Sequence, residues 1–276
     1  MPLVSPAALL QDAHGAVPAF NFITFEQLWA FRDAAESQGA GVILQLSQNA
    51  IAYHSGPEAP VAAAVAAARA SSAPIAVQLD HITDAALALR APELGATSVM
   101  FDASALDYDE NVATTARIAE QLHGSGIWVE AELGEVGGKD GVHDPAARTD
   151  REQAEAFAAA TGVDGLAVAV GSSHAMRSTG ATLDTALIAR IASRVSAPLV
   201  LHGSSGVSDA QLRAAIGAGI SKVNVGTRFN VLFTERLRAA LGADAAEVDP
   251  RKYLRPARQV MAAEAARILG VCAGRP

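Results

Sequence analysis

Three of the seven histidines stand at the carboxyl ends of short apolar runs: His81, His174 and His202. Three imidazoles with one open position form a common catalytic zinc sphere. From the residues alone, two interpretations stay open: a metal site, or three separate histidines hydrogen-bonded in a polar cleft. The other four fall in expected helix ends or loops, and we interpret them as surface side chains: His14, His54, His123 and His143.

Carboxylate, amide and hydroxyl side chains end the other apolar runs of the chain. Carboxylates beside imidazoles can bind metal ions or act as general acids and bases. If the runs are the strands of a barrel, their carboxyl ends meet at one rim, where such barrels carry their chemistry. The residues predicted to converge there with the histidines are Asn21, Ser47, Asp80, Asp102, Glu130, Glu132 and Asn224.

Three glycine-bearing segments follow these runs. HGSSG (202–206) and NVGT (224–227) end the last two, where small residues let backbone N–H groups approach phosphate oxygens. Each segment alone is also compatible with an ordinary turn, but together they favour a phosphorylated ligand. The longer segment LGEVGGKDGVHD (133–144) is either a surface loop or a lid that brings an acid over a substrate.

The apolar runs alternate with longer, alanine-rich segments typical of helices. Continuous rather than alternating apolar residues indicate parallel strands that are covered on both faces. The expected strands are 17–20, 41–46, 74–79, 97–101, 127–133, 165–170, 197–202 and 220–225. The expected helices are 24–38, 58–70, 109–122, 151–160, 183–194 and 208–217.

Eight strand–helix units in 276 residues predict an α/β fold, the (β/α)8 TIM barrel. A doubly wound open sheet would carry a glycine-rich phosphate loop after the first strand, but AFNFITFEQ (19–27) contains no glycine. Because no Pro-, Gly- or Ser-rich linker divides the chain, we expect residues 1–276 to form a single domain with a C-terminal helical extension from about Asp249.

Composition limits the class of partner. A net charge of -8, with 18% charged residues, argues against nucleic acid and against a polybasic membrane patch. One cysteine excludes a disulfide framework and a cysteine-based zinc module. The first residues lack the pattern of a signal peptide, and the alanine-rich run 61–70 is too short to span a bilayer. We therefore expect a cytoplasmic protein with neither nucleic acid nor membrane as partner.

Six motifs resemble those of one enzyme family. They are QLDH (78–81), SVMFDAS (98–104), VEAELGEVGG (129–138), VGSSH (170–174), LVLHGSSG (199–206) and KVNVGT (222–227). In order and spacing, from residue 17 to residue 258, the chain resembles the class II, metal-dependent fructose-bisphosphate and tagatose-bisphosphate aldolases. The resemblance implies cleavage of a ketose 1,6-bisphosphate to dihydroxyacetone phosphate and glyceraldehyde 3-phosphate.

The resemblance also implies a role for each matching residue. Asp80 would exchange the proton of the substrate's C4 hydroxyl, and Asp140 in the lid would protonate the enediolate product, with Asp144 as a second candidate. Glu130 and Lys222 are expected to be structural. The implied ligands of one zinc ion, or of an alternative ion site, are His81, His174, His202, Asp102 and Glu132. The implied substrate contacts are Asn21, Ser47, Gly203, Ser205, Asn224 and Thr227. The basic residues that relatives aim at the distal phosphate are not plainly matched, and Arg228, a cation next to the last motif, is our candidate for this contact.

Three positions depart from the family pattern, and they leave the substrate open. Ala175 stands where relatives have glycine. Gly226 stands where relatives have aspartate or alanine, and Asp140 stands where they have glutamate. One alternative is therefore an aldolase of the same mechanism that acts on another phosphorylated ketose. A second is a non-catalytic sugar-phosphate-binding barrel or subunit. The resemblance further implies a monovalent cation near the loops after the sixth and seventh strands, and a homodimer or homotetramer.

Overall fold

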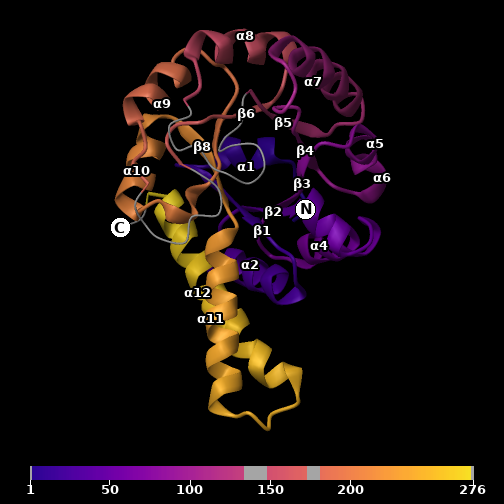
Figure 1. Cartoon of the computed structure of the whole chain (residues 1–276), viewed down its shortest axis with the longest axis vertical. Helices are drawn as coiled ribbons and strands as arrows, with labels where there is room; N and C mark the ends of the chain where they lie inside the picture. The colour runs from indigo at the N-terminus through magenta and orange to yellow at the C-terminus, as the bar shows by residue number, and fades with distance from the viewer. Residues whose placement is uncertain (1, 134–147, 173–180, 275–276) are drawn as a thin grey trace.

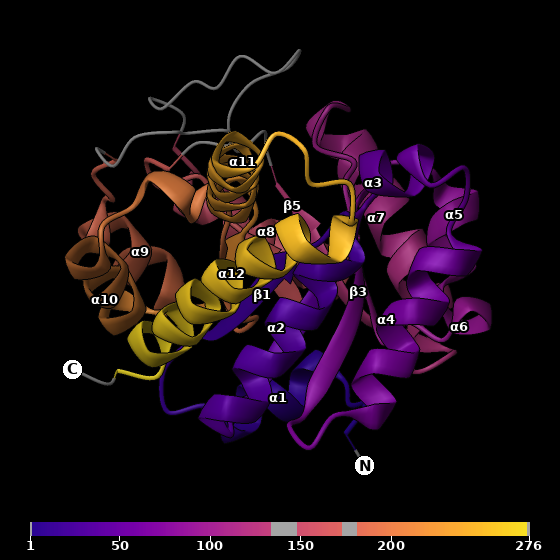
Figure 2. The same ribbon diagram turned by 90° about the horizontal axis from the view of Figure 1, so that it is seen from below.

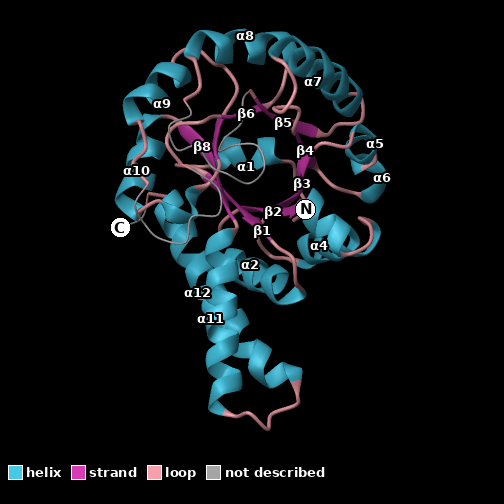
Figure 3. Ribbon diagram, in the orientation of Figure 1, coloured by secondary structure: helices cyan, strands magenta, loops and turns pink. Residues whose placement is uncertain are grey.

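Eight parallel strands close into a barrel in the order in which they occur along the chain, as Figures 1 and 3 show. The computed structural model describes residues 2–133, 148–172 and 181–274. The predicted (β/α)8 barrel is confirmed. Its strands are β1 (Val17–Asn21), β2 (Val42–Ser47), β3 (Ile75–Ile82), β4 (Ser98–Phe101), β5 (Trp128–Glu132), β6 (Gly165–Ala167), β7 (Leu199–Leu201) and β8 (Ile220–Val225).

Helices surround the barrel and include all six of the predicted ones. Their bounds are α2 (Phe25–Gln38), α4 (Glu58–Ala70), α7 (Tyr108–His123), α8 (Arg151–Thr161), α9 (Thr185–Ala192) and α10 (Asp209–Ala218). The structure adds the short helices α1 (Pro6–Asp12), α3 (Gln48–Tyr53), α5 (Ala85–Leu89) and α6 (Ala91–Leu94), and a 3-10 turn at Ser204–Gly206. Two long helices end the chain: α11 (Thr227–Ala243) and α12 (Pro250–Cys272).

Local sequence explains where the helices begin and end. Thr24 accepts a hydrogen bond from the backbone of Gln27, whose side chain reaches back to the cap, so the two form a capping box at the start of α2. The Ser208 hydroxyl caps α10 by accepting a hydrogen bond from the backbone N–H of Gln211. Gly39 ends α2 in the left-handed conformation, with φ of 55°, which glycine adopts without steric cost.

The predicted C-terminal helical extension from about Asp249 is confirmed as α12, which Asp249 caps. Directly after β8, α11 begins at Thr227, and α11 and α12 run side by side beyond the barrel wall in Figure 1. Figure 2 shows α12 crossing the outside of the barrel next to α2. At the root of this pair Phe229 packs on Phe31 of α2, with ring centroids 4.5 Å apart, and both rings contact Phe20 of β1. This aromatic cluster anchors the two long helices beside β1.

Polar side chains interrupt the apolar core on the inside of the barrel. Gln45, Gln78, Glu130 and Lys222 are all fully buried, on four different strands. Buried polar groups of this kind need hydrogen-bond partners inside the protein. Gln45 donates to Asp80, and Gln78 and Lys222 both donate to Glu130. No helix in the described part of the chain is long and apolar enough to cross a membrane.

Candidate active site

A bulge at the end of β3 turns two consecutive residues toward the same rim. Leu79 pairs with Val99 and Ile82 pairs with Phe101, so β3 carries one residue more than β4 between these two pairs. His81 takes a left-handed backbone conformation, with φ of 49°. In a regular strand Asp80 and His81 would point to opposite faces, whereas here both line one cavity. A bulge re-aims side chains in this manner.

Two amide groups hold the carboxylate of Asp80. Asn21 Nδ2 donates to Oδ2 over 2.7 Å, and Gln45 Nε2 donates to Oδ1 over 3.1 Å. The Asp80 side chain is almost fully buried. Both carboxylate oxygens accept hydrogen bonds from neutral amides on β1 and β2, so the carboxylate keeps one orientation. Neither amide brings a positive charge next to it. Such a carboxylate is suited to general acid–base work.

Asp102 lies next to His81. It is not one of the three residues that we call the metal-type group: His81, Glu132 and His202. Its Oδ2 is 3.0 Å from His81 Nδ1, and its Oδ1 accepts hydrogen bonds from the backbone N–H and the hydroxyl of Ser104. This carboxylate orients the imidazole and leaves Nε2 as the ring nitrogen available for other partners. A carboxylate behind a metal-binding histidine is a recurring arrangement. In this structure Asp102 contacts His81, and its expected role as a metal ligand or as part of an alternative ion site stays a prediction.

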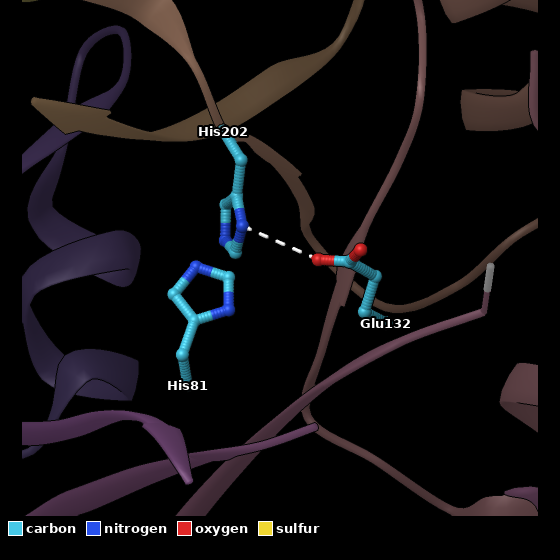
Figure 4. Close-up of side chains that lie close together, drawn as sticks. All are labelled: His81, Glu132 and His202. Carbon is cyan, nitrogen blue, oxygen red and sulfur yellow. Dashed lines mark ion pairs between the residues drawn. The ribbon is translucent and has the colours of Figure 1, made fainter. Parts of the chain in front are cut away.

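His202 stands between two glutamates of β5. Its Nε2 is 2.9 Å from Glu130 Oε1, and its Nδ1 is 3.4 Å from Glu132 Oε2. Figure 4 shows the His81 ring beside the His202 ring, with the Glu132 carboxylate at the side of both. The ring centroids of His81 and His202 are 4.8 Å apart. Potential ligand atoms of His81, Glu132 and His202 all lie within 4.8 Å of one another.

Electrostatics at this group favours positive charge. Burial lowers the pKa of His81, but Asp80, Asp102 and Glu132 outweigh burial and raise it to about 10. The pKa of His202 is also raised, because its hydrogen bonds to Glu130 and Glu132 outweigh burial. The field that favours a proton on each ring also favours a divalent cation in its place. Two imidazoles and a carboxylate are ligands that zinc accepts, so the residues present fit a metal ion.

A cavity of about 340 Å³ opens beside this group. It lies where β1, β2, β3, β7 and β8 end, so the predicted convergence of these strand ends is confirmed. Gly203, at its wall, has φ of 65° and starts the 3-10 turn that carries Ser205. The lining residues are Asn21, Phe22, Ile23, Ser47, Asn49, Asp80, His81, Gly203, Ser205, Asn224, Gly226, Thr227 and Asn230.

Arg228, a predicted substrate contact, is not among the residues that line this cavity. The guanidinium of Arg228 turns away and forms an ion pair with Glu264 of α12, with Nε and Oε1 2.9 Å apart. Its backbone N–H donates to the hydroxyl of Ser205, so Arg228 still contacts the cavity wall through its main chain. His174 and Asp140 lie outside the described residues, as do Asp144 and Ala175.

Comparison with known proteins identifies the family. The model of the class II fructose-bisphosphate aldolases matches residues 6–275, nearly the whole chain. The chain belongs to the class II fructose-bisphosphate aldolase family. It is therefore an enzyme, an aldehyde lyase of the metal-dependent class. The His81–Glu132–His202 group is the part of the described structure that fits the metal of this class.

Individual relatives match over almost their full length. The fructose-bisphosphate aldolase of Thermus caldophilus is 38% identical over 289 residues, covering 94% of this chain and 94% of that protein. A Bacillus subtilis (strain 168) protein named "Probable fructose-bisphosphate aldolase" is 37% identical and covers 95% of this chain and 94% of its own length. The crystal structure of the YdjI aldolase from Escherichia coli K12 superposes with a TM-score of 0.86 at 30% identity, covering 98% of this chain and 97% of that one.

Some residues of this aldolase site were missed by sequence reasoning. Gln45 holds Asp80, and Ser104 holds Asp102. Both stand close to predicted strand ends, at the end of β2 and just after β4, so position alone was a usable signal for them. Asn49 and Asn230 line the cavity from α3 and α11. The expectation that functional residues follow the carboxyl ends of strands, which we call the strand-end rule, does not point to residues inside helices.

Proposed function

We propose that the chain catalyses the reversible aldol cleavage of a ketose 1,6-bisphosphate to dihydroxyacetone phosphate and glyceraldehyde 3-phosphate. The observation that carries the proposal is the position of Asp80. Its carboxylate is held by two amides at the wall of a cavity, and the next residue, His81, belongs to the metal-type group. An acid–base group beside a Lewis-acid site is what aldol cleavage needs.

Asp80 accepts the proton of the C4 hydroxyl in this proposal. The C4 oxygen then forms the aldehyde carbonyl, the C3–C4 bond breaks, and its electron pair passes to C3 and the adjacent C2 carbonyl. A proton must afterwards be added at C3, and we assign this to Asp140. In the reverse direction Asp80 returns its proton to the C4 oxygen. Asn21 and Gln45 support both directions, because they keep the Asp80 oxygens in place.

The proposed cofactor is one zinc ion per chain, held by His81, His174 and His202 with Glu132 nearby. When bound, the ion would supply the Lewis acid that polarises the C2 carbonyl. Asp102 keeps its place behind His81 and orients that ring. We retain a monovalent cation near the loops after β6 and β7 as part of the proposal.

The phosphate of the C1 end is proposed to bind where β7 and β8 end. Gly203 and Ser205 follow β7, Asn224 lies near the end of the neighbouring strand β8 with Thr227 after it, and all four line the cavity. Thr227 is the first residue of α11, and a helix N-terminus presents backbone N–H groups that bind anions. Ser47, which ends β2 and also lines the cavity, is assigned to the rest of the substrate. Since the net charge is -8, attraction of this anionic substrate depends on such local groups.

The choice of ketose is assigned to the neighbourhood of Gly226. A Cβ atom at this position would lie 3.4 Å from Asn21 Cβ, so the missing side chain widens the cavity beside a residue that holds Asp80. A ketose that differs at C4 would be sensed here, which supports an aldolase of the same mechanism for another phosphorylated ketose as the second candidate. The placement of Asp80 argues against a non-catalytic barrel.

We further propose that the chain is a single domain, acts in the cytoplasm and forms a homodimer or homotetramer. Self-association is supported by the two projecting helices, where Leu241 is 41% exposed and Val248, in the loop between them, is 87% exposed. Apolar side chains on a projection are typical of contacts between subunits.

A coupled cleavage assay tests the proposal. Fructose 1,6-bisphosphate, tagatose 1,6-bisphosphate and the corresponding monophosphates are offered separately, and dihydroxyacetone phosphate is detected through NADH-dependent reduction. Turnover of at least one bisphosphate, well above that of its monophosphate, is expected. Turnover of a different phosphorylated ketose alone would favour the second candidate. A folded, zinc-loaded protein that cleaves none of them would contradict both.

A further inference from the structure

One amide of the cavity has a fixed orientation that the proposed function does not use. Asn230, near the start of α11, is an exposed residue that lines the cavity. We propose that Asn230 is a further substrate contact, whose Nδ2 donates a hydrogen bond to the C1 phosphate, and that Gln27 is the positioning residue that aims it. The inference rests on the proposed function, since it takes this phosphate to bind where β7 and β8 end.

The hydrogen bonds of Gln27 fix which way its own amide points. Gln27 Oε1 accepts from two backbone N–H groups, that of Ile23 over 2.7 Å and that of Thr24 over 3.1 Å. Because a backbone N–H only donates, the oxygen of the Gln27 amide must be the atom that faces them. Nε2 is therefore the atom that points the other way. Gln27 is only 2% exposed, so the protein rather than water supplies these partners.

The same reasoning passes from Gln27 to Asn230. Gln27 Nε2 donates to Asn230 Oδ1 over 2.8 Å. Since an amide nitrogen only donates, the oxygen of Asn230 must face Gln27, and Asn230 Nδ2 must face away from it. No residue in the described part of the chain accepts a hydrogen bond from Nδ2. The cavity therefore offers a ligand a donor that cannot turn into an acceptor without breaking the hydrogen bond to Gln27.

The helix places this donor beside the proposed phosphate contacts. Asn230 lies three residues after Thr227, so the two side chains are neighbours on one face of α11. Side chains of a helix lean toward its N-terminus, which brings the Asn230 amide toward Thr227 and the backbone N–H groups at the helix start. Both residues line the cavity, so this face of α11 is turned toward the ligand.

A phosphate oxygen is the acceptor that such a donor fits. A sugar hydroxyl rotates to donate or to accept and does not require a fixed partner, whereas an ionised phosphate oxygen only accepts. Among the described residues that line the cavity there is no lysine and no arginine. Oriented neutral donors are therefore what this wall offers to an anion, and Asn230 adds one to those at the start of α11.

Two substitutions of Asn230 test the contact itself. Asn230→Asp exchanges the donor for an acceptor of the same shape, so a charged oxygen takes the place of Nδ2 and repels the phosphate. Asn230→Ala removes the donor without adding charge, and its effect should be the smaller of the two. Gln121→Glu, the same change from amide to carboxylate at an exposed position of α7 outside the cavity, is the matched control.

Gln27→Glu tests the aiming step from a residue that does not line the cavity. One carboxylate oxygen still accepts from Ile23 and Thr24, and glutamate is favourable at this position of a capping box. The other oxygen replaces Nε2 and only accepts, so Asn230 turns its Nδ2 toward it and presents Oδ1 to the ligand. In an Asn230→Ala background no amide remains to be turned, and Gln27→Glu should have no further effect.

The readouts are the Kd of inorganic phosphate and of dihydroxyacetone phosphate for the zinc-loaded protein, by isothermal titration calorimetry, and steady-state cleavage of the preferred bisphosphate. Asn230→Ala is expected to raise both Kd values and KM about tenfold, and Asn230→Asp to raise them further. In Asn230→Ala, kcat is expected to stay within about threefold of the wild type, since this phosphate is bound alike in substrate and transition state. Gln27→Glu is expected to raise KM at least as much as Asn230→Ala, and Gln121→Glu to match the wild type.

Unchanged Kd and KM in Asn230→Asp overturn the inference, and this arm does not depend on whether Gln27→Glu folds. Equal effects of Gln27→Glu in the wild-type and Asn230→Ala backgrounds overturn the aiming role, because they assign the effect to charge alone. A wild type that cleaves its bisphosphate while Asn230→Asp binds phosphate equally well refutes the inference and leaves the proposed function standing. Phosphate binding that Asn230→Asp weakens, in a wild type that cleaves no ketose bisphosphate, supports the contact and refutes the proposed reaction.

Discussion

Asn21 of β1 donates a hydrogen bond to Asp80 of β3, with 2.7 Å between Nδ2 and Oδ2. The two residues are 59 positions apart in the chain and meet because β1 and β3 end at the same rim. Together with Gln45, Asn21 leaves the Asp80 carboxylate with one orientation beside His81. The relationship connects the barrel fold to the proposed proton transfer.

Replacing Asn21 by alanine should lower kcat by about 10–100-fold, because a misplaced acid–base group loses rate even when it remains present. Zinc content should stay that of the wild type, since Asn21 does not touch the metal-type group. Steady-state kinetics and metal analysis check both. Gln121→Ala, at an exposed position of α7 outside the cavity, is the control and should leave kcat within about threefold. Equal losses in both variants would show that Asn21 has no special relation to Asp80.

Replacing His202 by alanine should abolish stoichiometric zinc binding and leave the barrel folded. The matched control is His123→Ala, because His123 lies on the outer surface at the end of α7 and pairs with Asp164. Its zinc content should be unchanged. Metal analysis after gel filtration, with circular dichroism for the fold, measures the outcome. A His202→Ala protein with one bound zinc per chain would remove His202 from the ligand set.

Two glycines of the cavity should respond differently to alanine. Gly203 has φ of 65°, so Gly203→Ala should lower the free energy of unfolding by about 1–2 kcal/mol. Gly226 is not in the left-handed region, and an added Cβ would make ordinary contact with Asn21. Gly226→Ala should therefore change stability by less than about 0.5 kcal/mol. Urea unfolding compares the two.

Gly226→Ala should instead shift the ratio of kcat/KM between the fructose and tagatose bisphosphates, because the new methyl group contacts Asn21, which holds Asp80. The ratio is measured in the coupled assay against wild type. An unchanged ratio would remove Gly226 from substrate discrimination.

Cys272 should not react with thiol reagents in the native protein. Burial raises the pKa of its thiol to about 12 from an ordinary value of 9, and Asp209 adds to the rise. The thiolate is the reactive form, so at pH 8 labelling should be about a thousandfold slower than in urea. Because the folded pKa is the higher one, the stability that the neutral thiol contributes is complete below about pH 9 and is lost as pH rises toward 12. Rapid native labelling would contradict this burial.

The barrel could be predicted from the sequence because its signals are local. Each strand is a largely apolar run bounded by polar or glycine residues, and four of the six predicted helices begin at a capping side chain. The strand-end rule therefore assigns the polar residues to the correct rim from the sequence alone. Glu132 and His202, which belong to strands far apart in the chain, lie 3.4 Å from each other in the group predicted to hold the metal.

Other features depend on contacts that no local pattern contains. The bulge that turns Asp80 and His81 to one side comes from pairing with β4. Arg228 turns from the cavity because Glu264, 36 residues later, lies within reach of its guanidinium. The pairing of Lys222 with Glu130 spans 92 positions, so neither residue alone indicates more than a buried charge.

Zinc-dependent cleavage of the preferred bisphosphate tests the central claim most directly. Protein stripped with a chelator is titrated with zinc, and initial rates are followed in the coupled assay, with Asp80→Ala measured in parallel. The account predicts that turnover is absent without metal and rises to a break at one zinc per chain. Asp80→Ala should bind the same amount of zinc and remain at least about a hundredfold slower. Full turnover by folded, metal-free protein, or unchanged turnover in Asp80→Ala, would contradict the account.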